Sequence, residues 1–247
     1  MMPRVLVFDL KGSMAHFRMP DTTVTHASYP FIPRTALHGL LASILGLESL
    51  DNVQGEKGES EDNFVGVRLM SPVRSSFQKI SMLGKGWAGS RRDSFNRPVS
   101  IEVIANPYYR VYYTGTYLDE LEYMIASGRS KYHTYLGSCF CPVVPRYVDT
   151  QDAKHLDPIP PLLTTNTVVP TLAVERLIPQ PGCEYARAGG FHYEYLGGRQ
   201  FRGTLNIVYD VNGKPIVIEP SADFGKDPDE PRVKFFELAE GDIVCMW

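Results

Sequence analysis

The chain has 247 residues, 43% of them hydrophobic, which suffices for one large globular domain or two small ones. It contains no run of 18 apolar residues, and its first residues turn polar too early for a signal peptide. We therefore expect a cytoplasmic protein without a membrane span. The formal net charge of −3, taken alone, argues against a nucleic-acid partner.

The charges are unevenly distributed along the sequence. Residues 63–100 hold seven Lys or Arg and one Asp, a local net charge of +6. Residues 151–247 hold nine Lys or Arg and fourteen Asp or Glu, a local net charge of −5. A basic groove within a mildly acidic body would give this pattern. So would one solvated basic loop without a partner.

The first part of the chain alternates between strand and helix patterns. Residues 3–9 are a β-branched and aromatic run, which predicts a strand. Apolar residues at three- and four-residue spacing predict a helix over residues 34–47, with Gly39 on its other side. A glycine within a helix costs about 1 kcal/mol relative to Ala and usually marks the close approach of another group. Further patterns predict strands over 64–77, 99–113 (broken near Pro107) and 134–144, and a helix over 118–127.

This order is strand, helix, strand, strand, helix, strand, which is the ferredoxin-like arrangement also used by RNA-recognition (RRM-like) folds. We therefore predict an α+β protein with a first domain over residues 1–148. A proline-rich stretch follows, and then short strands with an Asn212-Gly213 hairpin signal. These patterns predict a second, small antiparallel β domain over residues 149–247.

The four cysteines do not form a metal-binding pattern. Only Cys139 and Cys141 are close in sequence, and a C-x-C pair without a companion histidine is a poor zinc site. We expect reduced thiols, no metal and no cofactor. Nucleotide-binding, serine-hydrolase and zinc-protease motifs do not occur in the sequence.

Two stretches combine residues that could bind RNA. The first precedes and opens the predicted helix, where free N–H groups attract phosphate. Its candidates are Lys11, His16, Arg18, His26, Tyr29, Arg34 and His38. The alternative is an ordinary strand-loop-helix unit with solvated basic residues.

The second stretch, residues 84–98, is basic and rich in glycine. Its cations can contact phosphates and its aromatic residues can stack on bases. For Trp87, a hydrophobic contact with a partner protein is nearly as good an explanation. The candidates here are Lys85, Trp87, Arg91, Arg92, Phe95 and Arg97.

Several motifs resemble the Cas-five family of the RAMP superfamily, most closely its members in subtype I-B CRISPR systems. The motifs are VLVFDLKGSMAHFR at 5–18 and SYPFIPRTALHGLLASILGL at 28–47, which carries Thr35, Gly39 and Gly46. A second match is KYHTYLGSCFCPV at 131–143. The resemblance covers about the first 150 residues.

The resemblance implies a ferredoxin-like palm with a β-hairpin thumb inserted at about 78–100. It implies a Cascade subunit that binds the 5′ handle of CRISPR RNA and caps the backbone filament of a type I effector complex in antiviral defence. The implied partners are CRISPR RNA, Cas-seven backbone subunits, a large Cas-eight-type subunit and, through the complex, target DNA. The expected RNA surface consists of Lys11, His16, Arg18, Tyr29, Arg34, His38, Lys85, Trp87, Arg91, Arg92, Arg97, Lys131 and Tyr135.

One branch of the family, in subtype I-C, is a metal-independent endoribonuclease that uses a Tyr, a Lys and a His. Here Tyr29, Lys131 and His133 could serve as general base, charge stabiliser and general acid. The match is imperfect, because Tyr132 separates the Lys from the His and the first motif differs from that branch. We therefore expect a binding protein without catalytic activity, with the endoribonuclease as the alternative. A scaffold without an RNA role is a third possibility.

Overall fold

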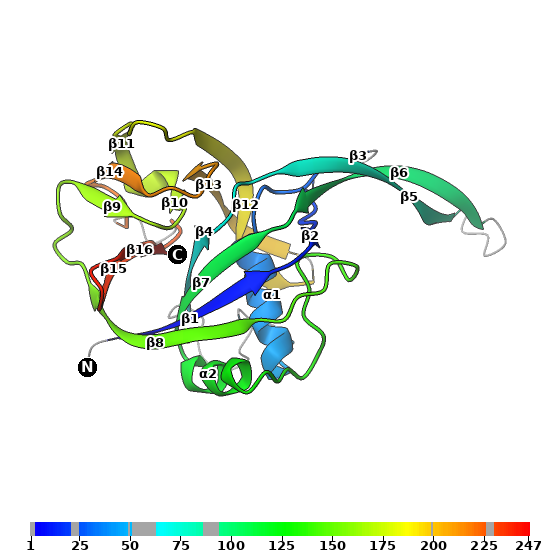
Figure 1. Cartoon of the computed structure of the whole chain (residues 1–247), viewed down its shortest axis with the longest axis horizontal. Helices are drawn as coiled ribbons and strands as arrows, with labels where there is room; N and C mark the ends of the chain where they lie inside the picture. Colours follow the sequence, from blue (N-terminus) through cyan, green and yellow to red (C-terminus); the bar gives the residue numbers. More distant parts are fainter. Residues whose placement is uncertain are drawn as a thin grey trace.

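The computed structural model describes residues 3–20, 25–48, 50, 63–85, 94–198, 200–225 and 230–247, with the backbone alone for 84–85 and 94–95. A six-stranded antiparallel sheet forms its centre, in the order β16-β15-β8-β1-β7-β4 (Figure 1). The strands are β1 (Arg4–Lys11), β4 (Phe64–Leu69), β7 (Tyr108–Thr114), β8 (Arg146–His155), β15 (Lys234–Leu238) and β16 (Ile243–Met246). Val65 and Trp247 exchange backbone hydrogen bonds of 3.1 and 2.9 Å. The two edges of the sheet therefore meet, and the sheet is nearly closed into a barrel.

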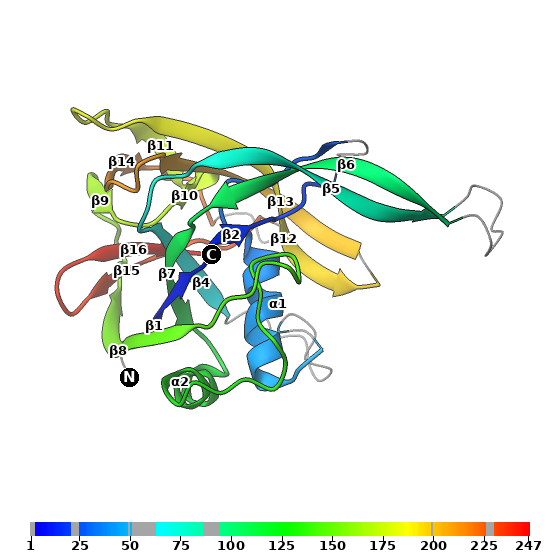
Figure 2. The same cartoon turned by 45° about the vertical axis from the view of Figure 1, so that its right-hand side comes forward.

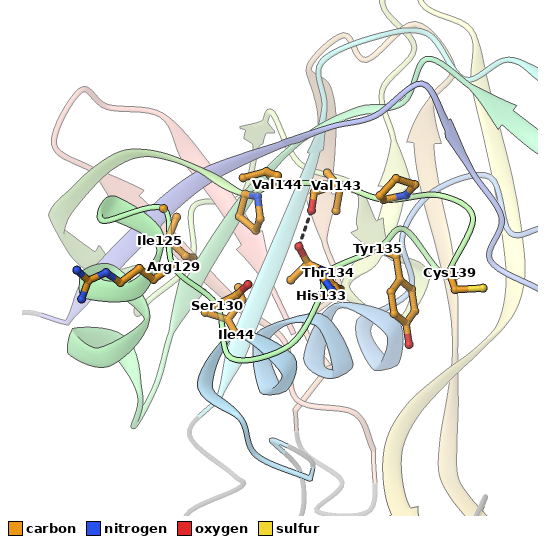
Figure 3. Close-up of a pocket in the computed structure, with 13 residues that line it drawn as sticks. Ile44, Ile125, Arg129, Ser130, His133, Thr134, Tyr135, Cys139, Val143 and Val144 are labelled. Carbon is orange, nitrogen blue, oxygen red and sulfur yellow. Dashed lines mark hydrogen bonds between the residues drawn. The ribbon is translucent and has the colours of Figure 1, made fainter.

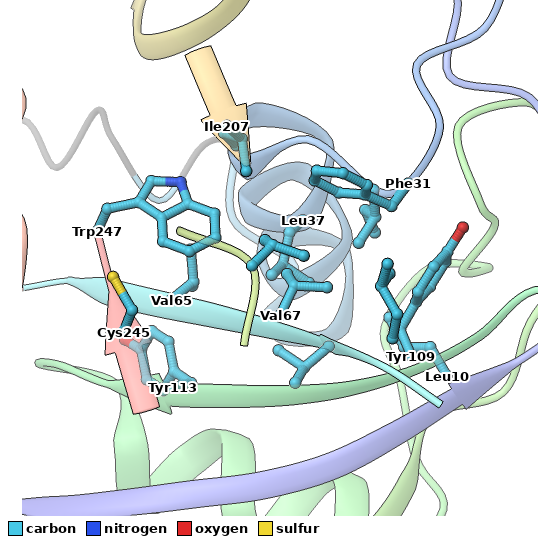
Figure 4. Packing of buried hydrophobic residues seen from close by; sticks show 14 of the residues in the cluster. Leu10, Phe31, Leu37, Val65, Val67, Tyr109, Tyr113, Ile207, Cys245 and Trp247 are labelled. Carbon is cyan, nitrogen blue, oxygen red and sulfur yellow. The ribbon is translucent and has the colours of Figure 1, made fainter. Parts of the chain in front are cut away.

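Helices α1 (Arg34–Leu45) and α2 (Leu118–Ala126) share the main hydrophobic core with one face of this sheet. Alternate residues of β1, beginning at Leu6, belong to that core, whereas Val5 and Val7 belong to a second cluster on the other face. Figure 4 shows Leu37 of α1 packed near Val67 of β4. Because β1 is buried on both faces, its sequence is a nearly continuous apolar run. Neither helix of the described chain is long and apolar enough to cross a membrane.

A distant loop completes the carboxyl end of α1. The helix ends at Gly46, which adopts the left-handed φ of 81° and donates its N–H to the Ala42 carbonyl. The backbone N–H groups of Lys131 and Tyr132 donate to the carbonyls of Ile44 and Ser43, each at 3.0 Å. The loop after α2 therefore satisfies carbonyl groups that the last helical turn would leave unpaired.

A long two-stranded arm extends away from the sheet (Figures 1 and 2). It consists of β5 (Ser75–Lys85) and β6 (Ser94–Ala105), paired in antiparallel register from Ser75 to Lys85. Two short strands, β2 (Met14–Ala15) and β3 (Thr25–His26), pair with β6 and tie the arm to the segment before α1. The described parts of the stretch at which the family resemblance implies a thumb, residues 78–85 and 94–100, belong to this arm.

The remaining strands form two three-stranded sheets, β10-β13-β12 and β11-β14-β9. Their elements are β9 (Leu163–Thr165), β10 (Val169–Pro170), the 3-10 helix η2 (Thr171–Ala173), β11 (Val174–Leu177), β12 (Tyr185–Gly197), β13 (Gln200–Asp210) and β14 (Ile216–Pro220). Strands β12 and β13 form a long hairpin whose tip lies beside α1 in Figure 2. Ile207 of β13 and Leu37 of α1 share the main core (Figure 4). The predicted boundary after residue 148 falls within β8 and stays a prediction.

The structure corrects three predicted elements. The strand over 134–144 is wrong: that segment is a loop with one isolated bridge, in which Gly137 turns back with a φ of 81°. The strand over 64–77 is two strands, β4 and β5, which belong to different sheets. The Asn212-Gly213 turn forms, with Gly213 against the Leu69 carbonyl, but its flanking strands pair with other partners and not with each other.

Candidate nucleic-acid interface

The open face of α1 carries two adjoining hollows, which we call the α1 groove. The first, of about 500 Å³, lies toward the tip of the β12–β13 hairpin. The second, of about 750 Å³, lies toward the loop after α2. Gly39 and Glu48 line both hollows, so the two adjoin at this point. The groove therefore runs along the helix surface from the C-terminal hairpin to Lys131 and His133.

Gly39 lies where the two hollows meet and is exposed. A Cβ added to it would have no heavy atom within 4 Å. The glycine is therefore not required by packing within the described residues, although it lowers helix stability relative to Ala. A helix face without a side chain at this position lets a group from outside the chain approach the backbone closely.

Two arginines, Arg18 and Arg97, lie near His16 and His26 where the arm joins the body, beside the first hollow. Burial and then the nearby charges of Arg18, His16 and Arg97 lower the pKa of His26. These four side chains come from the segment before α1 and from β6, and pairing between β3 and β6 brings the two segments together. Arg18 also lines the first hollow. Part of the predicted RNA surface is therefore assembled in one place.

Two predicted contact residues, Arg34 and Tyr29, are instead buried. Arg34 is 5% exposed; it donates to the backbone oxygens of Tyr193 at 2.6 Å, Trp247 at 3.3 Å and Asn63 at 3.4 Å, and lies over the Tyr193 ring. Tyr29 is 4% exposed, stacks on Phe191 and donates its hydroxyl to the Gly190 carbonyl at 2.5 Å. This burial favours a role in holding the β12 hairpin on α1 over the predicted direct contact with RNA.

The two predicted histidines before and within α1 are also largely enclosed. His38 is 1% exposed and borders the first hollow. His16 is 4% exposed; its Nδ1 lies 2.7 Å from the Glu102 carbonyl of β6, and its ring stacks near Phe140. The sequence pattern could not distinguish these buried rings from solvated ones, because burial depends on contacts with distant segments, which for His16 are β6 and the loop after α2.

The other predicted residues fall into two groups. Lys11 is exposed at the end of β1 and lies over the Tyr108 ring, Arg97 is exposed on β6, and Lys131 and Tyr135 are exposed on the second hollow. Trp87, Arg91 and Arg92 lie outside the described residues, and the side chains of Lys85 and Phe95 do as well.

The sequence analysis missed an aromatic wall of the first hollow. His192 and Tyr195 of β12 and Phe201 of β13 line it opposite α1. The rings of His192 and Phe201 stack with centroids 4.2 Å apart and planes inclined by 8°. The aromatic run FHYEYLGGRQF at 191–201 is the signal that could have indicated this wall.

A third hollow, of about 530 Å³, lies behind the loop after α2 (Figure 3). It is bordered by the ends of both helices, through Ile44 and Ile125, and by His133. Thr134 donates its hydroxyl to the Val143 carbonyl across the loop. This bond closes the loop on itself, whereas the backbone bonds from Lys131 and Tyr132 to Ile44 and Ser43 hold the segment against α1.

The comparisons with known proteins agree with the resemblance in the motifs. A family model described as "CRISPR-associated protein (Cas_Cas5)" matches residues 5–92. No curated protein matches the chain significantly.

Several solved structures are similar to this chain at low sequence identity. A chain described as "CRISPR RNA-guided surveillance complex" is 16% identical, with a TM-score of 0.54 over 88% of this chain and 91% of that one. A "Crystal structure of Cas protein" has a TM-score of 0.48 at 14% identity, over 85% and 95% of the two chains. A "Cryo-EM structure of the Type III-B Cmr-beta bound to cognate target RNA and AMPPnP, state 1" has a TM-score of 0.43 at 12% identity, over 87% and 86%. The family model thus matches residues 5–92 of this chain, and the first of these solved chains shares its fold.

Proposed function

We propose that this protein is a Cas-five subunit of a type I CRISPR surveillance complex, closest to subtype I-B, and that it binds the 5′ handle of CRISPR RNA in the α1 groove. The observation that carries the proposal is the open surface at Gly39, which joins two hollows and has no neighbouring atom to explain a glycine. A helix surface without a side chain at this point would let a group of the RNA approach the backbone closely. The cations near His26 would hold the phosphates.

We also propose which elements form the palm and the thumb of this subunit. Strands β8, β1, β7 and β4, with α1 and α2, would form the ferredoxin-like palm, and the β5–β6 arm would be the thumb. The palm would hold the RNA, and the subunit would cap a filament of Cas-seven subunits. A large Cas-eight-type subunit and target DNA would be the further partners in the assembled complex.

Fluorescence anisotropy with a labelled, unstructured ribo-oligonucleotide across a salt series tests the proposal. For single strands, the slope of log affinity against log salt is about −0.7 per phosphate contact. Arg18→Ala/Arg97→Ala should therefore reduce the slope by about 1.4 if each cation holds one phosphate. The matched control is Arg4→Ala/Arg176→Ala, which removes the same charge from exposed ion pairs elsewhere. Absence of salt-dependent binding by the wild-type protein would favour a scaffold without an RNA role.

The endoribonuclease remains the second candidate, because Lys131 and His133 both line the second hollow. Tyr29 lines the first hollow, but its hydroxyl already donates to Gly190. We propose that the protein binds RNA without cleaving it. Incubation of the pure protein with repeat RNA and EDTA distinguishes the two functions. Specific cleavage of the RNA that His133→Ala abolishes would establish endoribonuclease activity.

A further inference from the structure

The first hollow of the α1 groove has the chemistry of a site for a flat aromatic ligand. One wall carries the stacked pair of His192 and Phe201, with Tyr195 tilted against Phe201 at a centroid distance of 5.4 Å. Phe201 is 41% exposed. An aromatic pair left partly open to water in a hollow presents a π face on which a base can stack.

The part of the hollow formed by α1 and Glu48 lets a ligand approach closely but does not favour a phosphate. Gly39 presents bare helix backbone, and Glu48 contributes a carboxylate to the same hollow. A carboxylate repels phosphate, but it accepts hydrogen bonds from the amino groups of bases. Arg18 lines the same hollow and belongs to the cationic cluster beside it. The hollow thus has two parts. The aromatic rings and Glu48 could bind a base, and Arg18 could bind the phosphate backbone of the RNA.

We propose that this hollow binds one unpaired nucleobase of the RNA, stacked on Phe201, with an amino group directed at Glu48. The inference rests on the proposed function and adds to it a base-binding site built by the C-terminal β12–β13 hairpin. The volume of about 500 Å³ lies within the range of small-ligand pockets and is ample for a nucleoside. The sugar-phosphate backbone of the RNA would continue past Arg18 toward the β5–β6 arm.

The experiment measures the anisotropy of labelled ribo-oligonucleotides of adenosine, cytidine or uridine, and the fluorescence of 2-aminopurine placed at each position in turn. Removal of one stacking side chain typically costs 1–3 kcal/mol, so Phe201→Ala should weaken binding roughly 5- to 150-fold and leave the salt slope unchanged. It should also remove the quenching of 2-aminopurine at one position. Phe201→Tyr should restore both, and Glu48→Gln should narrow the preference for amino-bearing bases over uracil. Tyr123→Ala, an exposed aromatic truncation on α2, is the control.

The outcomes separate this inference from the function beneath it. If the wild-type protein shows no salt-dependent affinity for any of the oligonucleotides, the proposed function and the base site fail together. If the wild-type protein binds RNA, but Phe201→Ala binds it equally well with unchanged quenching, only the base site is overturned. If Phe201→Ala and Tyr123→Ala weaken binding equally, the effect is not specific to the hollow and the base site is again rejected.

Discussion

Gly39→Ala should make the protein more stable and a poorer binder of RNA at the same time. The added methyl group meets no atom within 4 Å, so the folded chain accommodates it without strain. An exposed helical Gly→Ala change stabilises by about 0.5–1 kcal/mol. For a chain of this size, that raises the Tm by roughly 1–4 °C.

The same methyl group would occupy the place where the RNA approaches the helix. Overpacking of a close contact costs about 1–3 kcal/mol, which corresponds to a loss of affinity of roughly 5- to 150-fold. Thermal unfolding and anisotropy on the same sample measure both effects, and Gly39→Leu should lower the affinity further. Wild-type affinity in a stabilised Gly39→Ala protein would refute the placement of RNA at this point of α1.

Three further outcomes are expected. Arg34→Ala should lower the free energy of unfolding by about 3 kcal/mol, because three backbone oxygens lose a charged donor; an unchanged Tm with weaker RNA binding would restore the sequence-based role of Arg34. The pKa of His26 is lower in the folded protein than in the unfolded chain, so the unfolded chain binds a proton at this site at a higher pH than the folded protein does. The contribution of His26 to the free energy of unfolding is therefore present above about pH 6.5 and is lost as the pH falls. Bound phosphate should raise that pKa in an NMR titration, and RNA that leaves it unchanged would contradict a phosphate contact there. Burial raises the pKa of Cys141 to about 11, so an alkylating reagent at pH 8 should modify exposed Cys139 well before Cys141, as peptide mass analysis would show.

The sequence determined the elements whose pattern is local. The apolar run of β1 and the spacing within α1 predicted both elements to within two residues at each end. Strand β8 was missed because its sequence, RYVDTQDAKH, is polar and largely exposed, and it is a strand only because it pairs with β1 and β15. The sequence also predicts the close approach of another group at Gly39, and the Gly39→Ala measurements test that prediction.

Only the tertiary structure decided which candidate side chains reach the surface. Arg34 and Arg18 have the same chemistry and lie sixteen positions apart in the sequence. The β12 hairpin and Trp247 cover Arg34, whereas Arg18 stays at the rim of the first hollow. The aromatic wall at His192 and Phe201 likewise exists because the long hairpin folds back onto α1. Burial and convergence arise from contacts between distant segments, and no local pattern in the sequence encodes them.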